Sequence, residues 1–209
     1  MTSGEARKDL VILVADKNME FALRGILSRH RSLRIRPVSA DIYKYPEWDP
    51  GCYHRGPDFL QPFVNQYGHA LLILDREGSG QEHRGRLEIE EILEKRLAES
   101  GWADRAAAIV IDPELEVWVW SDSPHVDIAL GWQNKTPSLR DWLVHAGYLA
   151  EGQMKPARPK KAMEEALRAV REPRSSAVYR DIAEKVSLDR CMDESFRKLK
   201  SVLRKWFRQ

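Results

Sequence analysis

The stretch Ala70–Gly80, which reads Ala-Leu-Leu-Ile-Leu-Asp-Arg-Glu-Gly-Ser-Gly, constrains the fold of this chain more than any other. Its first half is a continuous apolar run, which is typical of a strand buried on both faces of a sheet. Asp75 and Glu77 follow at once, and on an extended backbone residues two apart point to the same side. We therefore expect both carboxylates at the carboxyl end of the strand, where open α/β sheets bind ligands. Hard oxygen ligands favour Mg²⁺ or Mn²⁺, and the alternative is a polar turn with two solvated acids.

Two further apolar runs of the same kind also end in acidic residues. Leu10–Ala15 is followed by Asp16, a short loop and Glu20, and Ala106–Ile111 is followed by Asp112, Glu114 and Glu116. If the three runs are neighbouring parallel strands, their acids meet at one edge of the sheet. Carboxylates held close together repel one another, and a bound divalent cation is the simplest remedy.

The intervening segments predict a simple alternation of strands and helices. Asn18 is a reasonable N-cap for a helix after the first strand, and Leu33–Asp41 has the alternation of an edge strand. Residues 42–57 predict an aromatic loop, because Pro and Gly interrupt any periodicity. Glu82–Ser100 predicts a long amphipathic helix with Leu87 in its buried stripe, and we expect Trp118 and Trp120 to be core residues.

Several classes of protein are excluded or disfavoured by what the sequence lacks. No apolar run approaches the ~20 residues that cross a bilayer, and Met1–Asp9 has no apolar core of a signal peptide. Cys52 and Cys191 stand far apart without zinc-type spacing, so we expect free thiols and a reducing cytoplasm. Glycine-rich phosphate loops are absent, and no Ser-His-Asp set is convincing.

Charge divides the chain unevenly and suggests two parts, residues 1–153 and residues 154–209. The second part holds 16 Lys and Arg against 8 Asp and Glu, whereas the first holds 18 against 24. An acidic part that holds metal, joined to a basic helical part that binds nucleic acid, fits this asymmetry, and ordinary helices with basic faces are the alternative. The candidate phosphate contacts in the second part are basic residues on its expected helices: Arg168, Arg171, Arg174, Lys198 and Lys200.

The order strand, acid, short loop, Glu20, helix, then strand with Asp75-x-Glu77-Gly resembles the Toprim fold of topoisomerases, primases and overcoming-lysogenization-defect nucleases. The segment Asp112–Asp122, which reads Asp-Pro-Glu-Leu-Glu-Val-Trp-Val-Trp-Ser-Asp, is similar to a segment of Toprim-like proteins from bacterial defence islands. A small component of methylation-associated anti-phage systems is similar too. The resemblance covers about residues 10–122 and implies an α/β fold, with a mainly parallel sheet flanked by helices and a C-terminal helical subdomain.

The resemblance implies a Mg²⁺- or Mn²⁺-dependent nuclease that hydrolyses phosphodiester bonds of DNA or RNA in anti-phage defence. Glu20, Asp75 and Glu77 take the catalytic positions, and the implied metal ligands are these three together with Asp16 and Glu116. The sequence departs from the family pattern, because Asp16 stands where Glu is usual, Lys17 replaces Gly, and Glu77 replaces the second Asp of the paired motif.

These departures keep a second hypothesis open, in which the Toprim-like core is non-catalytic. Such a chain would bind partner proteins or sense nucleic acid as a subunit of a defence complex, and it would also allow an oligomer. The aromatic segment 43–54 favours this alternative, since aromatic loops often contact partners. Binding of a divalent cation distinguishes the two hypotheses.

Overall fold

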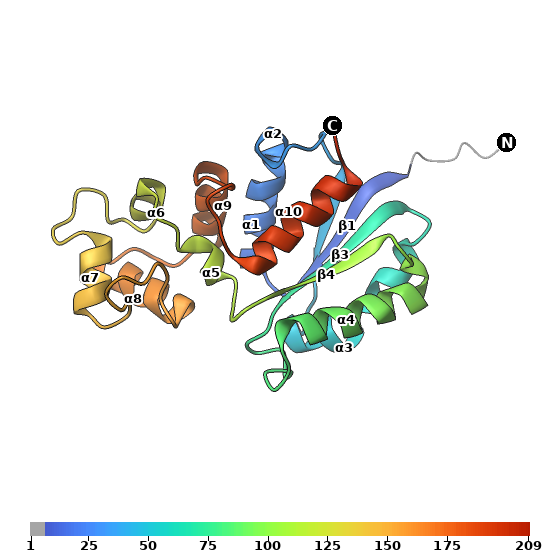
Figure 1. Ribbon diagram of the computed structural model, residues 1–209, viewed down its shortest axis with the longest axis horizontal. Helices are drawn as coiled ribbons and strands as arrows, with labels where there is room; N and C mark the ends of the chain where they lie inside the picture. The colour runs from blue at the N-terminus through green and yellow to red at the C-terminus, as the bar shows by residue number, and fades with distance from the viewer. Residues whose placement is uncertain (1–6) are drawn as a thin grey trace.

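The structure, a computed structural model, describes residues 7–209 and has an α/β fold built on a four-stranded, all-parallel sheet (Figure 1). The expected α/β class with a mainly parallel sheet is confirmed and is consistent with a Toprim-like fold. The strand order is β2-β1-β3-β4, so the three strands that end in acids are neighbours, as predicted. Their bounds are β1 (Lys8–Val14), β2 (Ala40–Lys44), β3 (Tyr67–Asp75) and β4 (Ala106–Ile111).

The apolar runs become strands because both faces of the sheet are covered. Leu10–Val14 and Ala70–Leu74 are fully buried in the two central strands β1 and β3. An edge strand was expected over Leu33–Asp41, and an edge strand exists, but it is β2 at Ala40–Lys44. Residues 30–33 instead form the short helix α2 (His30–Leu33).

Helices cover the sheet on both faces (Figure 1). On one face lie α3 (Trp48–Leu60) and α4 (Arg86–Leu97), each followed by a short irregular turn, η1 (Gln61–Phe63) and η2 (Ala98–Trp102). On the other face lie α1 (Lys17–Ser28) and α10 (Glu194–Trp206). The sheet is thus the middle layer of three. The helices cover its faces, and the connecting loops lie at the ends of its strands.

The predicted loop over residues 42–57 is wrong, because most of it belongs to α3. The two glycines that argued against a helix allow the helix to approach its neighbours. A Cβ on Gly56 would lie 2.9 Å from the side chain of Leu72 in β3, and one on Gly51 would lie 2.5 Å from the ring of Tyr45. Pro50 falls in the first turn, where a missing N–H costs nothing. Packing therefore explains the composition that looked like a loop.

The expected helix over Glu82–Ser100 is present as α4, but Leu87 is not in its buried stripe. Its side chain is 60% exposed, whereas Ile89 and Leu93 are buried against the sheet. The stripe is also partly polar, since Glu90 is buried with them. The true helix begins at Arg86, after the turn that follows β3.

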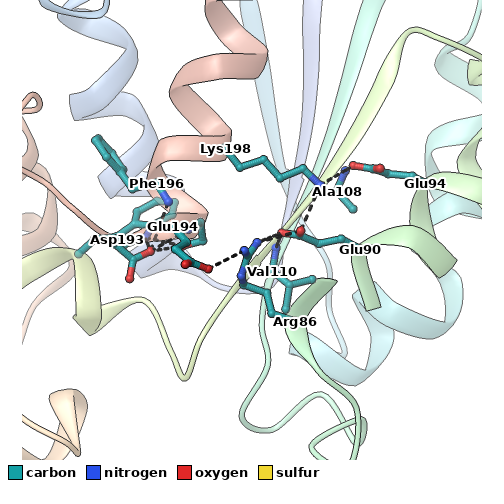
Figure 2. A network of polar contacts seen from close by, with 11 residues as sticks. Arg86, Glu90, Glu94, Ala108, Val110, Asp193, Glu194, Phe196 and Lys198 are labelled. Carbon is teal, nitrogen blue, oxygen red and sulfur yellow. Dashed lines mark hydrogen bonds and ion pairs between the residues drawn. The ribbon is translucent and has the colours of Figure 1, made fainter. Parts of the chain in front are cut away.

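Buried Glu90 has a clear structural role at the open edge of β4 (Figure 2). The N–H of Val110 donates to Glu90 at 3.0 Å, and the N–H of Ala108 donates to Glu94 at 3.1 Å. Lys198 of α10 lies between the two carboxylates, at 3.2 Å from Glu90 and 2.7 Å from Glu94. Two acids of α4 thus satisfy edge N–H groups that would otherwise offer a site for another strand.

The remaining helices extend the molecule beyond the carboxyl ends of the strands (Figure 1). They are α5 (Glu116–Val119), α6 (Pro124–Ala129), α7 (Leu139–His145), α8 (Pro159–Val170) and α9 (Ser176–Lys185). Residues 154–209 were expected to be helical, and they form α8, α9 and α10. The core prediction for Trp118 and Trp120 is also confirmed, since both are buried and their indole N–H groups donate to Ser195 and to the carbonyl of Pro159.

The C-terminal helices share one hydrophobic cluster with the sheet. Helix α9 packs against α1 so closely that a Cβ on Gly25 would lie 2.8 Å from the Cβ of Ala183. The expected division into residues 1–153 and 154–209 stays a prediction, and its first six residues lie outside the described part. In residues 7–209, no helix is long and apolar enough to cross a membrane.

Candidate functional site

The acids that follow β1, β3 and β4 lie at one edge of the sheet, because these strands are adjacent and parallel. Val14 of β1 pairs with Ile73 of β3, and Asp75 of β3 pairs with Ile111 of β4. The strand ends are therefore in register to within a few residues. Parallel strands deliver whatever follows them to the same place, which for this chain is a set of carboxylates.

Asp75, the last residue of β3, lies at the centre of this set. Its Oδ1 atom is buried and has no hydrogen-bond partner within residues 7–209. Burial and the negative charges of Asp49 and Glu116 raise the pKa of Asp75 well above its usual value. An ionised Asp75 thus lacks any compensation from the protein at this atom, which is costly for a buried charge.

Asp49 is the second acid of the site, and the sequence analysis did not identify it. It lies in the first turn of α3, and its Oδ1 accepts the backbone N–H of Asp75 at 2.7 Å. Burial, with a smaller contribution from the charge of Asp16, raises the pKa of Asp49 to about 6, although the hydrogen bond from Asp75 opposes the shift. The sequence Trp-Asp-Pro at residues 48–50 was a usable signal, because Asp and Pro favour the first turn of a helix.

Asp16 is the third acid, and it caps α1. Its side chain accepts the N–H of Met19 at 2.8 Å, so the prediction of Asn18 as the N-cap is wrong. Asn18 instead accepts a hydrogen bond from Ser176 of α9 at 2.8 Å. The positive end of the α1 dipole favours a carboxylate at position 16, and the charge of Asp16 contributes to the raised pKa values of both Asp49 and Asp75.

Glu20 and Glu77, two of the predicted catalytic residues, make no described contact with Asp75. Glu20 does fall in the first turn of α1, as expected, but its carboxylate is bound by Arg24 at 2.8 Å. The expectation that Asp75 and Glu77 converge on an extended backbone is wrong. The strand ends at Asp75, residues 76–80 form turns with Gly78 at φ +84°, and Glu77 is exposed.

Of the acids after β4, Glu114 and Glu116 are buried and have partners in the C-terminal helices, whereas Asp112 is exposed and pairs with Arg76. Glu116 accepts hydrogen bonds from Arg174 at 2.8 Å and from the hydroxyl of Tyr179 at 2.5 Å. Glu114 accepts the backbone N–H of Lys160 at 3.0 Å, and burial together with the charge of Glu116 raises the pKa of Glu114. Glu116 is therefore held by one cation and one hydroxyl group and is a poorer metal ligand than the sequence suggested.

The predicted phosphate contacts divide into exposed and internally bound groups. Arg171 is exposed at the end of α8, and Arg168 is exposed and pairs with Glu165. The other three already have protein partners, so their role as phosphate contacts stays a prediction. Arg174 binds Glu116 and Glu164, Lys198 binds Glu90 and Glu94 (Figure 2), and buried Lys200 donates to the carbonyl of Leu188.

The donor set fits a hard divalent cation in its chemistry, although it is not assembled as a metal site. No three His, Cys, Asp or Glu side chains in the described part of the chain are grouped so that they could hold an ion. Asp16, Asp49 and Asp75 nevertheless supply only carboxylate oxygens, and the orphaned Oδ1 of Asp75 lacks a positive partner. A cation would relieve the repulsion between carboxylates that contributes to the raised pKa values of Asp49 and Asp75, and it would require the three side chains to draw together.

Comparisons with protein-family models, curated proteins and solved structures find no match to this chain. The Toprim resemblance therefore rests on the strand-end motifs and on the strand arrangement.

Proposed function

We propose that this chain is a Mg²⁺- or Mn²⁺-dependent nuclease of Toprim type that hydrolyses phosphodiester bonds of foreign DNA or RNA in anti-phage defence. The observation that carries the proposal is the buried, unpartnered Oδ1 of Asp75 among like charges at the carboxyl edge of a parallel sheet. Natural proteins rarely leave a buried carboxylate oxygen without a partner. A site that binds a cation accounts for the exception.

Asp16, Asp49 and Asp75 are the residues that would hold the ion. When bound, such a cation polarises a phosphoryl oxygen and lowers the pKa of an attacking water. The protein contributes the arrangement of the ligands: β3 places Asp75, the backbone N–H of Asp75 orients Asp49, and the N-cap geometry fixes Asp16. Glu20 remains a candidate general base only if Arg24 releases its carboxylate.

The proposed setting is the cytoplasm, which is supported by two free thiols, Cys52 and Cys191. Proposed partners are nucleic acid and other proteins of a defence system. Binding of the cation is the first property to test.

The experiment is a plasmid-nicking and RNA-cutting assay in Mn²⁺ with wild-type protein, Asp75→Asn and Glu88→Gln. Asp75→Asn removes the charge of the central ligand at almost unchanged size, and we expect it to abolish cutting. Glu88 is an exposed acid in the first turn of α4 that pairs with Arg84, so Glu88→Gln should retain activity. Cutting that persists in Asp75→Asn would refute the assigned role.

A second candidate function is a non-catalytic, partner-binding or nucleic-acid-sensing subunit of a defence complex. The observation that favours it is the neutralisation of Glu116 by Arg174 and Tyr179, which removes a ligand that the resemblance implies. Absence of Mn²⁺ binding by calorimetry, together with stable co-purification with the products of neighbouring genes, would support this function instead.

A further inference from the structure

Lys160 is a basic residue at the acidic edge that the sequence did not single out. It is the second residue of α8, and two contacts tie the start of this helix to the segment after β4. The backbone N–H of Lys160 donates to Oε1 of Glu114 at 3.0 Å, and the indole of Trp120 donates to the carbonyl of Pro159 at 2.9 Å. These contacts fix the backbone from which the Lys160 side chain extends.

The ammonium group itself is left almost free. It forms an ion pair with Oε2 of Glu114 at 3.7 Å, which is too long for a hydrogen bond. The side chain is 47% exposed, and its Nζ donates no hydrogen bond to any residue in 7–209. Arg174 differs, because its guanidinium is bound to Glu116, Glu164 and the hydroxyl of Tyr179. Lys160 therefore has donors to spare, and Arg174 does not.

The charge of Lys160 also interacts with the charges of two proposed metal ligands, Asp49 and Asp75. Burial lowers the pKa of Lys160, but the charges of Glu116, Glu114 and Asp75 outweigh it, so that the pKa is raised. In turn, the charge of Lys160 lowers the pKa of Asp49. The ammonium group thus stays positive and lies within electrostatic reach of two of the three proposed ligands.

We propose that Lys160 binds a non-bridging phosphate oxygen of a nucleic-acid backbone at the carboxyl edge of the sheet. This inference rests on the proposed function and adds a substrate-binding residue to it. A phosphodiester carries a negative charge and is repelled by the carboxylates that hold the cation, so the edge needs a positive group that is free to bind it. Lysine is suited to this role, since its compact ammonium carries three donors and binds phosphate as a point charge.

The test measures binding of a short fluorescein-labelled single-stranded DNA, and of RNA of the same sequence, across a series of salt concentrations. Ca²⁺ replaces Mn²⁺ to prevent cutting. The variants are Lys160→Met, Lys160→Arg and the matched control Lys161→Met. Lys161 is the next residue of the same helix, and it pairs with Glu165 at 3.3 Å.

Lys160→Met should weaken binding of the tighter probe about tenfold and reduce the salt slope by about one, as loss of one phosphate contact does. Lys160→Arg should retain the slope, and Lys161→Met should bind within about twofold of wild type. Equal losses in Lys160→Met and Lys161→Met, an unchanged salt slope, or no binding of either probe by wild type would overturn the inference.

Calorimetry with Mn²⁺ on the same proteins separates this inference from the proposed function. Lys160→Met should bind Mn²⁺ at least as tightly as wild type, because a repelling charge has been removed. Wild type that binds no Mn²⁺ would refute the metal site, yet Lys160-dependent binding of nucleic acid would still support the lysine. Wild type that binds Mn²⁺, with Lys160→Met unchanged towards nucleic acid, would refute the lysine alone.

Discussion

Replacing Asp49 by Asn should stabilise the protein in the absence of divalent cations. Burial, with a further contribution from the charge of Asp16, raises the pKa of Asp49 from 3.8 to about 6. A carboxyl group whose pKa is raised on folding costs stability once pH exceeds its unfolded pKa. At about 1.4 kcal/mol for each pKa unit, the cost at pH 7 is about 3 kcal/mol. Asn is nearly the same size, and its Oδ1 can still accept the N–H of Asp75.

The stability difference between wild type and Asp49→Asn should depend on pH, so the assay is urea unfolding in EDTA at several pH values. Below pH ~4 the carboxyl is protonated in both states, so wild type and Asp49→Asn should be equally stable. Between pH ~4 and ~6 the wild type should lose its relative stability, and above pH ~6 the difference should level off. The control is Asp58→Asn, an exposed acid of the same helix, which should change stability by less than about 0.5 kcal/mol.

Two results would refute the reasoning about Asp49. A difference of the same size at every pH would show that packing, not charge, distinguishes Asn from Asp. A loss of stability in Asp49→Asn at pH 7 would show that the carboxylate is already compensated. In either case the edge would not carry the excess of negative charge that the proposed cation is needed to relieve.

Three further predictions concern the framework that positions the site. Glu90→Ala should destabilise by about 3–5 kcal/mol in urea, because it leaves the Val110 N–H and two cations, of Arg86 and Lys198, without their buried carboxylate (Figure 2). Burial lowers the pKa of His69, so wild-type stability should fall as pH drops below ~6.5, and His69→Phe should remove this dependence. Gly25→Ala should cost about 1–3 kcal/mol in thermal unfolding, because its Cβ would collide with α9.

Each of these three has a control of the same residue type. Glu91→Ala changes an exposed acid of α4, His83→Phe changes an exposed histidine, and Gly85→Ala adds a Cβ with nothing within 4 Å. Each control should stay near wild type. Glu90→Ala or Gly25→Ala at wild-type stability, or a pH profile that His69→Phe leaves unchanged, would contradict the corresponding contact.

The sheet was predictable because its central strands are continuous runs of apolar residues in the sequence. Leu10–Val14 and Ala70–Leu74 are buried on both faces, so no alternation was needed to find them. The acids after β1, β3 and β4 were predictable for the same reason, since they stand where apolar runs stop. Their common edge followed from the parallel order, which the structure bears out.

Helix α3 and the acid that it carries were not predictable by the same reading. Gly51 and Gly56 look like loop residues until the neighbours that exclude a Cβ are known, and these neighbours come from β3 and from the segment before the helix. Asp49 was therefore assigned to a loop and was missed as a member of the site. Glu77 was expected to point to the same side as Asp75 because the sequence does not show that the strand ends at Asp75.

The partners of Lys160 and Arg174 could not be predicted from the sequence, since they lie 46 and 58 positions away along the chain. Arg174 was expected to contact phosphate, and Lys160 was not singled out from the basic C-terminal segment. Long-range contacts decide which basic side chain is bound by other residues of the protein and which remains available to a ligand. On this ground Arg174 has a structural role, whereas Lys160 is the residue that we propose to bind phosphate.

The most direct measurement is a crystal grown or soaked in Mn²⁺ and recorded for anomalous scattering. We predict an anomalous peak at the carboxyl edge of the sheet, in contact with Asp75 and bounded by Asp16 and Asp49. The same crystal of Asp75→Asn should lack the peak. Absence of a peak in wild type, or a peak that does not involve Asp75, would contradict the claim that these acids form a cation site.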